Sequence, residues 1–181
     1  MAKIIAFTGY AGCGKSYWTT ETIKLIHKIN PNATAVRMAF ADEIKRYGEQ
    51  VGIVKGNVDF RQRISDFTKP GREIGAWCQL TECAIRALNP VVDFIVIEDV
   101  RFVYEVQMLL NYNTSLFGLI RPGIERIKVD TEDSVDKILK EFWPTTIFEN
   151  TGTIESNESI KEILEIYIES PKGCEGGVCP L

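Results

Sequence analysis

The fold is decided by Gly9-Tyr10-Ala11-Gly12-Cys13-Gly14-Lys15-Ser16, a stretch near the start of this 181-residue chain. It fits the pattern GxxxxGK[ST] at every fixed position, directly after the apolar run Ile4–Phe7 and directly before a helix-like segment. Glycines let the backbone curl so that successive N–H groups point at a polyphosphate, and the following helix adds the positive end of its dipole. The sequence therefore predicts a strand, a phosphate-binding loop and a helix, and so a nucleotide phosphate binder.

Individual residues of this loop have distinct predicted roles. Lys15 is placed to neutralise the β- and γ-phosphates of a nucleotide, and the Ser16 hydroxyl is placed to ligate Mg²⁺. At Cys13 the backbone N–H, rather than the thiol, is the group that meets the phosphates. We expect nucleotide binding by Ala11, Gly12, Cys13, Gly14, Lys15, Ser16 and Tyr17.

Composition indicates one compact unit. The chain is 45% hydrophobic and 25% charged, enough to bury a core within a single domain, which we place at residues 1–170 with a flexible tail at 171–181. A net charge of −4 argues against a binder of nucleic acid polymers or of membrane surfaces. The N-terminus lacks a signal sequence, and no apolar run approaches the roughly 20 residues that cross a bilayer. We therefore expect a cytoplasmic protein.

Strand-like and helix-like segments alternate along the chain. Strands are expected at 3–8, 34–40, 91–97, 116–120 and 145–148, and helices follow them, with a helix at 72–88 and another at about 132–142. The segment 52–71 is polar and is expected to be irregular. This alternation is typical of an α/β protein, and with the loop it predicts a three-layer P-loop NTPase fold around a central parallel sheet.

An acidic pair closes the most hydrophobic strand. The run Val91–Ile97 leads into Glu98-Asp99-Val100-Arg101. In phosphate-loop folds an aspartate at the carboxyl end of a central strand holds Mg²⁺, often through water. We predict Asp99 in that role, with Glu98 second; the alternative is an acid that caps the next helix.

Basic residues gather in the middle of the chain. Those at the ends of elements near the motifs are favoured as substrate contacts, because phosphoryl transfer builds negative charge that arginines stabilise. A phosphate acceptor needs mainly charge neutralisation, whereas a hydroxyl acceptor enlists a base such as Asp42, so the arginine-rich middle favours a phosphate without excluding a hydroxyl. The favoured residues are Arg72, Arg101 and Arg121; Lys45, Arg46, Arg61, Arg63 and Arg126 are further cations of this set.

Five cysteines, an odd number, are read as free thiols, and a four-thiolate zinc site from Cys78, Cys83, Cys174 and Cys179 is disfavoured. Two residues five positions apart on a helix lie about 140° apart around its axis, so Cys78 and Cys83 point in different directions. The single histidine, His27, falls inside the first expected helix and is read as solvated or helix-terminal.

Four segments resemble the bacteriophage deoxynucleoside monophosphate kinases. They are Phe40-Ala41-Asp42-Glu43-Ile44-Lys45, Asp99-Val100-Arg101-Phe102 with Glu105, Arg121-Pro122-Gly123, and Glu149-Asn150-Thr151-Gly152-Thr153. The resemblance runs to about Ile168. It departs from the family at Val103-Tyr104 and at Asp130-Thr131-Glu132-Asp133. It implies a nucleoside monophosphate kinase-like fold, with an acceptor-binding region at about 42–90 and a lid at about 121–131.

The resemblance also implies the reaction and the site. ATP would give its γ-phosphoryl group to a deoxynucleoside 5′-monophosphate, with Mg²⁺ as cofactor, in the host cytoplasm if a phage encodes the chain. It implies acceptor binding by Asp42, Lys45, Arg72, Trp77 and Arg101, a lid that carries Arg121 and Arg126, and an ATP base near Asn150 and Gly152. The predicted catalytic residues are Lys15, Arg72, Asp99, Arg121 and Arg126, and the predicted metal ligands are Ser16 and Asp99.

Two alternatives stay open at this point. A kinase of another small metabolite, of the dephospho-coenzyme A or phosphomevalonate type, would share the loop and differ in the acceptor pocket. A non-catalytic nucleotide-binding switch would share it too, although the chain has no guanine-specifying Asn-Lys-x-Asp motif and supplies its own arginines. The base and sugar of the acceptor and the oligomeric state, with a homodimer among the options, are left undecided.

Overall fold

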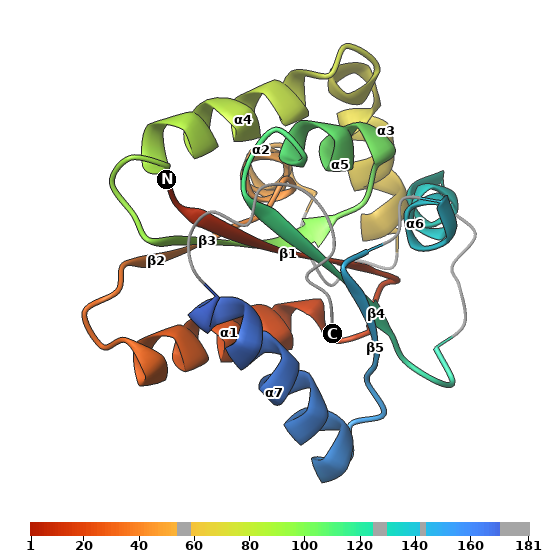
Figure 1. Cartoon of the computed structure of the whole chain (residues 1–181). Helices are drawn as coiled ribbons and strands as arrows, with labels where there is room; N and C mark the ends of the chain where they lie inside the picture. Colours follow the sequence, from red (N-terminus) through yellow and green to blue (C-terminus); the bar gives the residue numbers. More distant parts are fainter. Residues whose placement is uncertain (54–58, 125–129, 142–143, 171–181) are drawn as a thin grey trace.

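A computed structural model describes residues 1–53, 59–124, 130–141 and 144–170 of the protein (Figure 1). Five strands form one parallel sheet in the order β2-β3-β1-β4-β5. Their bounds are Lys3–Gly9 for β1, Ala35–Met38 for β2, Phe94–Val100 for β3, Thr114–Ile120 for β4 and Thr146–Glu149 for β5. β1, which carries the phosphate loop at its carboxyl end, is therefore the central strand.

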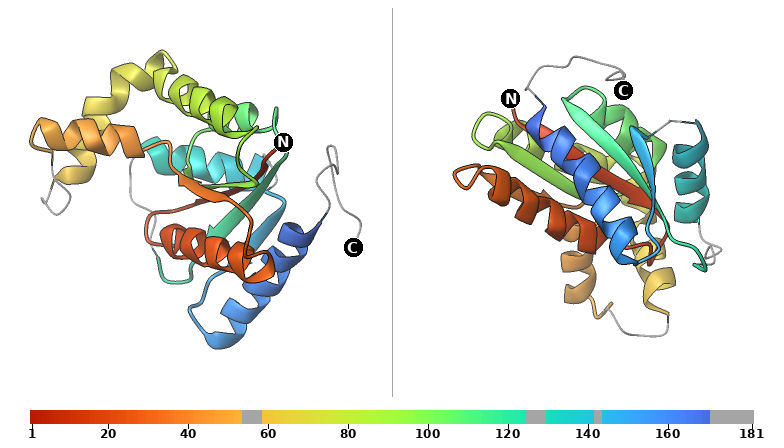
Figure 2. Two further views of the ribbon diagram at one scale, coloured as in Figure 1. Left: turned by 90° about the vertical axis from the view of Figure 1, so that its left-hand side faces the viewer. Right: turned by 60° about the horizontal axis from the view of Figure 1, so that its bottom comes forward.

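Helices cover both faces of the sheet and make three layers. α1 (Lys15–Ile29) and α7 (Ile154–Glu169) lie side by side on one face, as Figures 1 and 2 show. α4 (Ala76–Leu88), α5 (Val103–Leu109) and α6 (Asp130–Glu141) pack on the other face. α2 (Asp42–Gln50) and α3 (Phe60–Glu73) stand out from the sheet beside α4 (Figure 2). The α/β architecture predicted from the sequence is confirmed.

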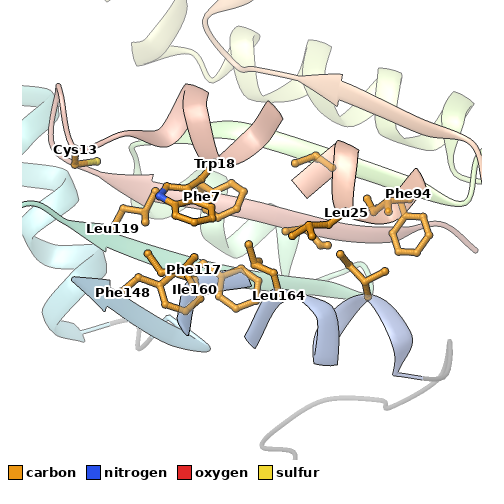
Figure 3. Packing of buried hydrophobic residues seen from close by; sticks show 14 of the residues in the cluster. Phe7, Cys13, Trp18, Leu25, Phe94, Phe117, Leu119, Phe148, Ile160 and Leu164 are labelled. Atoms are coloured by element: carbon orange, nitrogen blue, oxygen red, sulfur yellow. The ribbon is translucent and has the colours of Figure 1, made fainter. Parts of the chain in front are cut away.

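Two apolar clusters hold these layers together. Phe7, Trp18, Phe117, Phe148 and Leu164 join the sheet to α1 and α7 (Figure 3). A second cluster on the opposite face includes Ile4, Ala6, Ile97, Val106 and Ile138. Successive residues of a strand point to opposite faces. Both faces of β1 are covered, which explains why its sequence is continuously apolar rather than alternating.

The segment 52–71, predicted to be irregular, contains most of α3. Pro70 and Gly71 favour a turn in the sequence, yet both lie in the last turn of this helix. Proline has no backbone N–H and so removes one intrahelical hydrogen bond, yet α3 continues past Pro70 to Glu73. The predicted helix 72–88 is also wrong in its first turn: Gly75, at φ 70°, separates α3 from α4.

None of the described helices has both the length and the apolar composition that spanning a membrane requires. The predicted tail, 171–181, lies outside the described residues.

Candidate functional site

The phosphate loop connects β1 to α1 by a backbone that glycine makes possible. Gly14 precedes the first residue of α1 with φ 104°, a left-handed conformation that other residues rarely adopt. A Cβ atom at Gly14 would lie 2.4 Å from Asn150 Nδ2, and one at Gly9 would lie 2.3 Å from the Leu119 carbonyl oxygen. These glycines therefore allow both the turn and the close approach of the strands beside it.

Lys15 lies inside the loop. Its Nζ donates hydrogen bonds to the carbonyl oxygens of Gly9 at 2.7 Å and Tyr10 at 2.8 Å, and the side chain is buried. Burial, followed by the charge of Arg101, lowers the pKa of Lys15 below its usual value. The ammonium is thus held by carbonyl oxygens of the loop itself, in the segment where the motif requires a cation for a phosphate.

Asn150 supports the loop from the end of β5. Its Nδ2 donates to the Cys13 carbonyl oxygen at 2.8 Å, and its own N–H donates to Ile120 O at 2.7 Å. Asn150 is buried, so the structure places this side chain on the loop backbone. Gly152, predicted with it, lies in an exposed turn at φ 80°. Tyr17 is largely exposed and packs edge-on against Trp18.

The Ser16 hydroxyl meets Glu98 rather than Asp99. Ser16 Oγ donates to Glu98 Oε1 at 2.5 Å, and Arg37 Nε donates to Glu98 Oε2 at 2.6 Å. Arg37 also donates to Asp42, at 2.8 Å from Nη1. Burial raises the pKa of Glu98, but the hydrogen bonds from Ser16 and Arg37 outweigh it and bring this pKa below its usual range. Glu98 is therefore a stable carboxylate beside the loop serine.

Asp99 has different surroundings. The pairing of β1 with β3 shifts between Ala6 and Thr8, a bulge that re-aims the side chains opposite it, Glu98 and Asp99. Asp99 is buried, and its Oδ1 has no hydrogen-bond partner among the described residues. Burial raises its pKa, against the charges of Arg101, Lys45 and Lys15. The two acids were predicted to close this strand, and both lie within the last residues of β3.

These residues fit a Mg²⁺ site of the kind that nucleotides need. Mg²⁺ prefers oxygen ligands and is usually held by one or two carboxylates together with phosphates and water. Ser16 Oγ, the Glu98 carboxylate and the unpartnered Oδ1 of buried Asp99 are such oxygens, gathered at the loop. Glu98 is the hydrogen-bond partner of Ser16, and metal binding by Asp99, with Glu98 second, stays a prediction.

The predicted acceptor residues converge only in part. Arg101 Nε lies 3.9 Å from Asp99 Oδ2, and Lys45 is close enough to oppose the raised pKa of Asp99. Arg72 Cζ lies 5.8 Å from the centroid of the Phe102 ring. Lys45 and Arg101 are thus both near Asp99, whereas Arg72 contacts the ring of the residue that follows Arg101.

Trp77 has a structural position. Its indole N–H donates to the Thr68 carbonyl oxygen at 3.1 Å, and a Cβ on Gly71 would lie 2.4 Å from Nε1. The ring therefore fastens α3 to α4. Its predicted contact with the acceptor stays a prediction.

The predicted lid begins near the phosphate loop. Arg121 is exposed at the carboxyl end of β4, and Ile124 Cδ1 would lie 3.2 Å from a Cβ on Gly12. The turn 121–124 is thus next to the loop, as a lid requires. Arg126 and Arg121 were predicted together; Arg126 lies outside the described residues.

Two glutamates were not predicted as site residues. Glu132 Oε1 accepts from the Ala11 N–H at 2.9 Å, and Glu105 Oε2 accepts from the N–H groups of Arg101 at 2.7 Å and Phe102 at 3.0 Å. Burial raises the pKa of Glu105 to about 8. Phe102 precedes the first residue of α5, and Glu105 lies three residues later, which is the spacing of a capping box. This spacing is visible in the sequence. No local pattern connects Ala11 with Glu132.

The zinc alternative finds no support in the described part of the chain, which contains no group of three or more metal-binding side chains of the His, Cys, Asp and Glu kinds. Cys78 is a half-buried free thiol and Cys83 an exposed one, and Cys174 and Cys179 lie outside the described residues.

Several solved structures are similar in fold to this chain. Crystal structures similar to this chain include Kti12 of Chaetomium thermophilum in complex with ADP-AlF3 (TM-score 0.54, 10% identity, 92% of this chain and 100% of that one). APE1195 is also similar (TM-score 0.51, 13% identity, 93% and 97% coverage). The shikimate kinase of Bacteroides thetaiotaomicron matches with a TM-score of 0.48 and 14% identity over 93% of this chain and 99% of that one. Neither a family model nor a curated protein matches the sequence.

The sheet, the flanking helices and the loop define the class. This is an α/β P-loop NTPase fold, with a parallel five-stranded sheet and the phosphate loop after its central strand.

Proposed function

We propose that this protein is an ATP-dependent kinase whose acceptor is the phosphate of a deoxynucleoside 5′-monophosphate. The observation that carries the proposal is the set of cations from separate elements, Lys15, Lys45 and Arg101, around the buried Asp99 at the carboxyl end of the sheet. Ligands of open α/β sheets bind at this end. Cations on both sides of the reacting centre suit a reaction in which donor and acceptor are both phosphates.

The residues divide the work between donor and acceptor. The loop N–H groups and Lys15 bind the triphosphate, and Ser16 and Glu98 would hold Mg²⁺, which neutralises charge on the phosphate oxygens when it is bound. Arg101 and Lys45 bind the acceptor phosphate, which arrives ionised and needs no strong base. Arg72, which contacts the ring of Phe102, is a further cation proposed for the acceptor.

The resemblance of the segments around Asp42, Asp99, Arg121 and Asn150 to the phage deoxynucleoside monophosphate kinases supports the choice of a deoxynucleotide. The structure adds that Asp42 is joined through Arg37 to Glu98, the residue before Asp99, and that Asn150 donates to the loop at Cys13.

An assay of ADP formation from Mg·ATP tests the proposal. We expect strong stimulation by one or more deoxynucleoside monophosphates in a panel that also contains ribonucleotides, dephospho-coenzyme A and phosphomevalonate. Stimulation by one of the last two alone would identify a different metabolite kinase. Slow hydrolysis that no acceptor changes would indicate a nucleotide-binding switch.

A further inference from the structure

Glu132 lies where the phosphate loop and the acceptor side meet. Its Oε1 accepts a hydrogen bond from the Ala11 N–H at 2.9 Å and lies 3.8 Å from Nη1 of Arg101. Only 2% of the Glu132 side chain is exposed. A carboxylate this deeply buried costs free energy unless it is paired and hydrogen-bonded, and Glu132 has both kinds of partner.

Arg101 is held from two sides. Its Nη1 faces Glu132, and its Nε lies 3.9 Å from Oδ2 of Asp99, whose side chain is 9% exposed. A guanidinium is planar and presents its donors in fixed directions, so two carboxylates on different edges restrict its orientation. The Arg101 side chain keeps 26% exposure. The Arg101 side chain is therefore not closed off from solvent.

A second contact fixes where Glu132 sits. One turn further along α6, Asp136 accepts a hydrogen bond from the Tyr10 hydroxyl. Positions four apart lie on the same face of a helix. Glu132 and Asp136 thus dock α6 on two consecutive residues of the phosphate loop, Tyr10 and Ala11, and the register of α6 is set.

We infer that Glu132 is a positioning residue that fixes Arg101 relative to the phosphate loop, so that an acceptor phosphate bound by Arg101 faces the donor phosphate. The inference rests on the proposed kinase function, because it assigns Arg101 to the acceptor. Reaction rates are sensitive to such alignment: a displacement of about 1 Å can cost about a hundredfold.

The test is Glu132→Gln, with Glu141→Gln as its matched control. The amide oxygen of glutamine can still accept from the Ala11 N–H, but the charge opposite Arg101 is gone. Glu141 is an exposed residue at the end of the same helix. Three quantities are measured in each variant: the Kd of Mg·ATP without acceptor, kcat/KM for the nucleoside monophosphate, and the NMR signal of the Arg101 Nε–H, assigned by its loss in Arg101→Lys.

For Glu132→Gln we expect kcat/KM for the acceptor to fall by at least about tenfold. The Kd of Mg·ATP should change by less than about threefold, because the bond to Ala11 is retained. The Arg101 signal should shift or broaden. The control should match the wild type in all three measurements.

Other outcomes overturn the inference. Unchanged acceptor kinetics with an unchanged Arg101 signal would leave Glu132 as a structural residue only. Tighter ATP binding with unchanged acceptor kinetics would make Glu132 a competitor of the nucleotide at Ala11. If the wild type transfers phosphate to no acceptor, the proposed function fails. A shifted Arg101 signal in Glu132→Gln would then still establish the contact between Glu132 and Arg101. An unshifted signal would show that this contact does not exist.

Discussion

Ser16 and Glu98 are joined by a hydrogen bond of 2.5 Å although 82 residues separate them in the chain. This bond connects the phosphate loop to the strand next to it, and through Arg37 it extends to Asp42 at the start of α2. Asp99, the next residue after Glu98, contacts Arg101 instead. Two adjacent carboxylates thus serve two different sets of partners, which leads to separate expectations for each.

The first prediction concerns metal affinity. We expect Glu98→Gln to raise the Mg²⁺ concentration for half-maximal turnover by about tenfold, since groups that orient a metal ligand affect affinity by that order. Asp99→Asn should weaken Mg²⁺-dependent turnover as well, but by less. Titrating Mg²⁺ in the turnover assay and in binding of a fluorescent ATP analogue measures both. If only Asp99→Asn changed the Mg²⁺ concentration for half-maximal turnover, Asp99 rather than Glu98 would be the metal ligand.

The second prediction concerns Lys15. Lys15→Ala should reduce phosphoryl transfer by at least about a hundredfold, because a positioned cation at the transferred group is lost. The fold should persist, since the core clusters do not include this side chain. Turnover and thermal unfolding are the measurements. Lys24→Ala is the control: this lysine lies on the same helix with 68% of its side chain exposed, and its loss should leave turnover unchanged. Full activity of Lys15→Ala would exclude the loop as the donor site.

The third prediction concerns Arg121. Its exposed position beside the phosphate loop suits a residue that acts on the transition state. Arg121→Ala should therefore lower kcat by at least about tenfold, with a smaller change in ATP affinity. Steady-state kinetics and a separate ATP-binding measurement distinguish the two quantities. Arg86→Ala, on the surface of α4, should alter neither. Equal losses of kcat and ATP affinity in Arg121→Ala would mean that Arg121 binds the ground state.

The fourth prediction concerns pH. Burial raises the pKa of Glu105 in the folded protein to about 8, from its usual value of 4.5. The folded state therefore binds more protons than the unfolded state between these values, and the contribution of Glu105 to the free energy of unfolding falls as pH rises through this window.

Urea unfolding at pH 5 and pH 8 tests this expectation. The midpoint should be lower at pH 8, and Glu105→Gln should reduce the difference, because the amide keeps an acceptor for Arg101 and Phe102 and cannot titrate there. An identical pH dependence in Glu105→Gln would show that this carboxyl titrates normally.

Much of the fold could be predicted because its signals are local. The loop pattern, the apolar run before it and the helical spacing after it all lie within residues 3–29, and the structure confirms β1 and α1 there. α3 was missed because Pro70 and Gly71 are turn signals, whereas in the structure α3 continues through both and Gly71 packs against Trp77.

The site was harder to predict than the fold. A strand ending in two acids indicates a carboxylate at the loop, but the bulge in β3 decides which acid meets Ser16, and no one-dimensional pattern encodes that bulge. Arg37 and Glu132 were missed for a related reason. Their partners, Glu98 and Ala11, are 61 and 121 residues away, and only the paired strands and the docked α6 bring them together.

The supports of the phosphate loop also bear on how the protein is made. The loop is among the first segments to be synthesised, yet the side chains that hold it, Glu132 and Asn150, follow their partners by 121 and 137 residues. Contacts of such sequence separation form slowly, because a long stretch of chain must first be ordered. A nascent chain that ends after β4 would carry the complete motif without either support. The capacity to bind nucleotide should therefore arise late in folding, together with α6 and β5, rather than with the segment that encodes it.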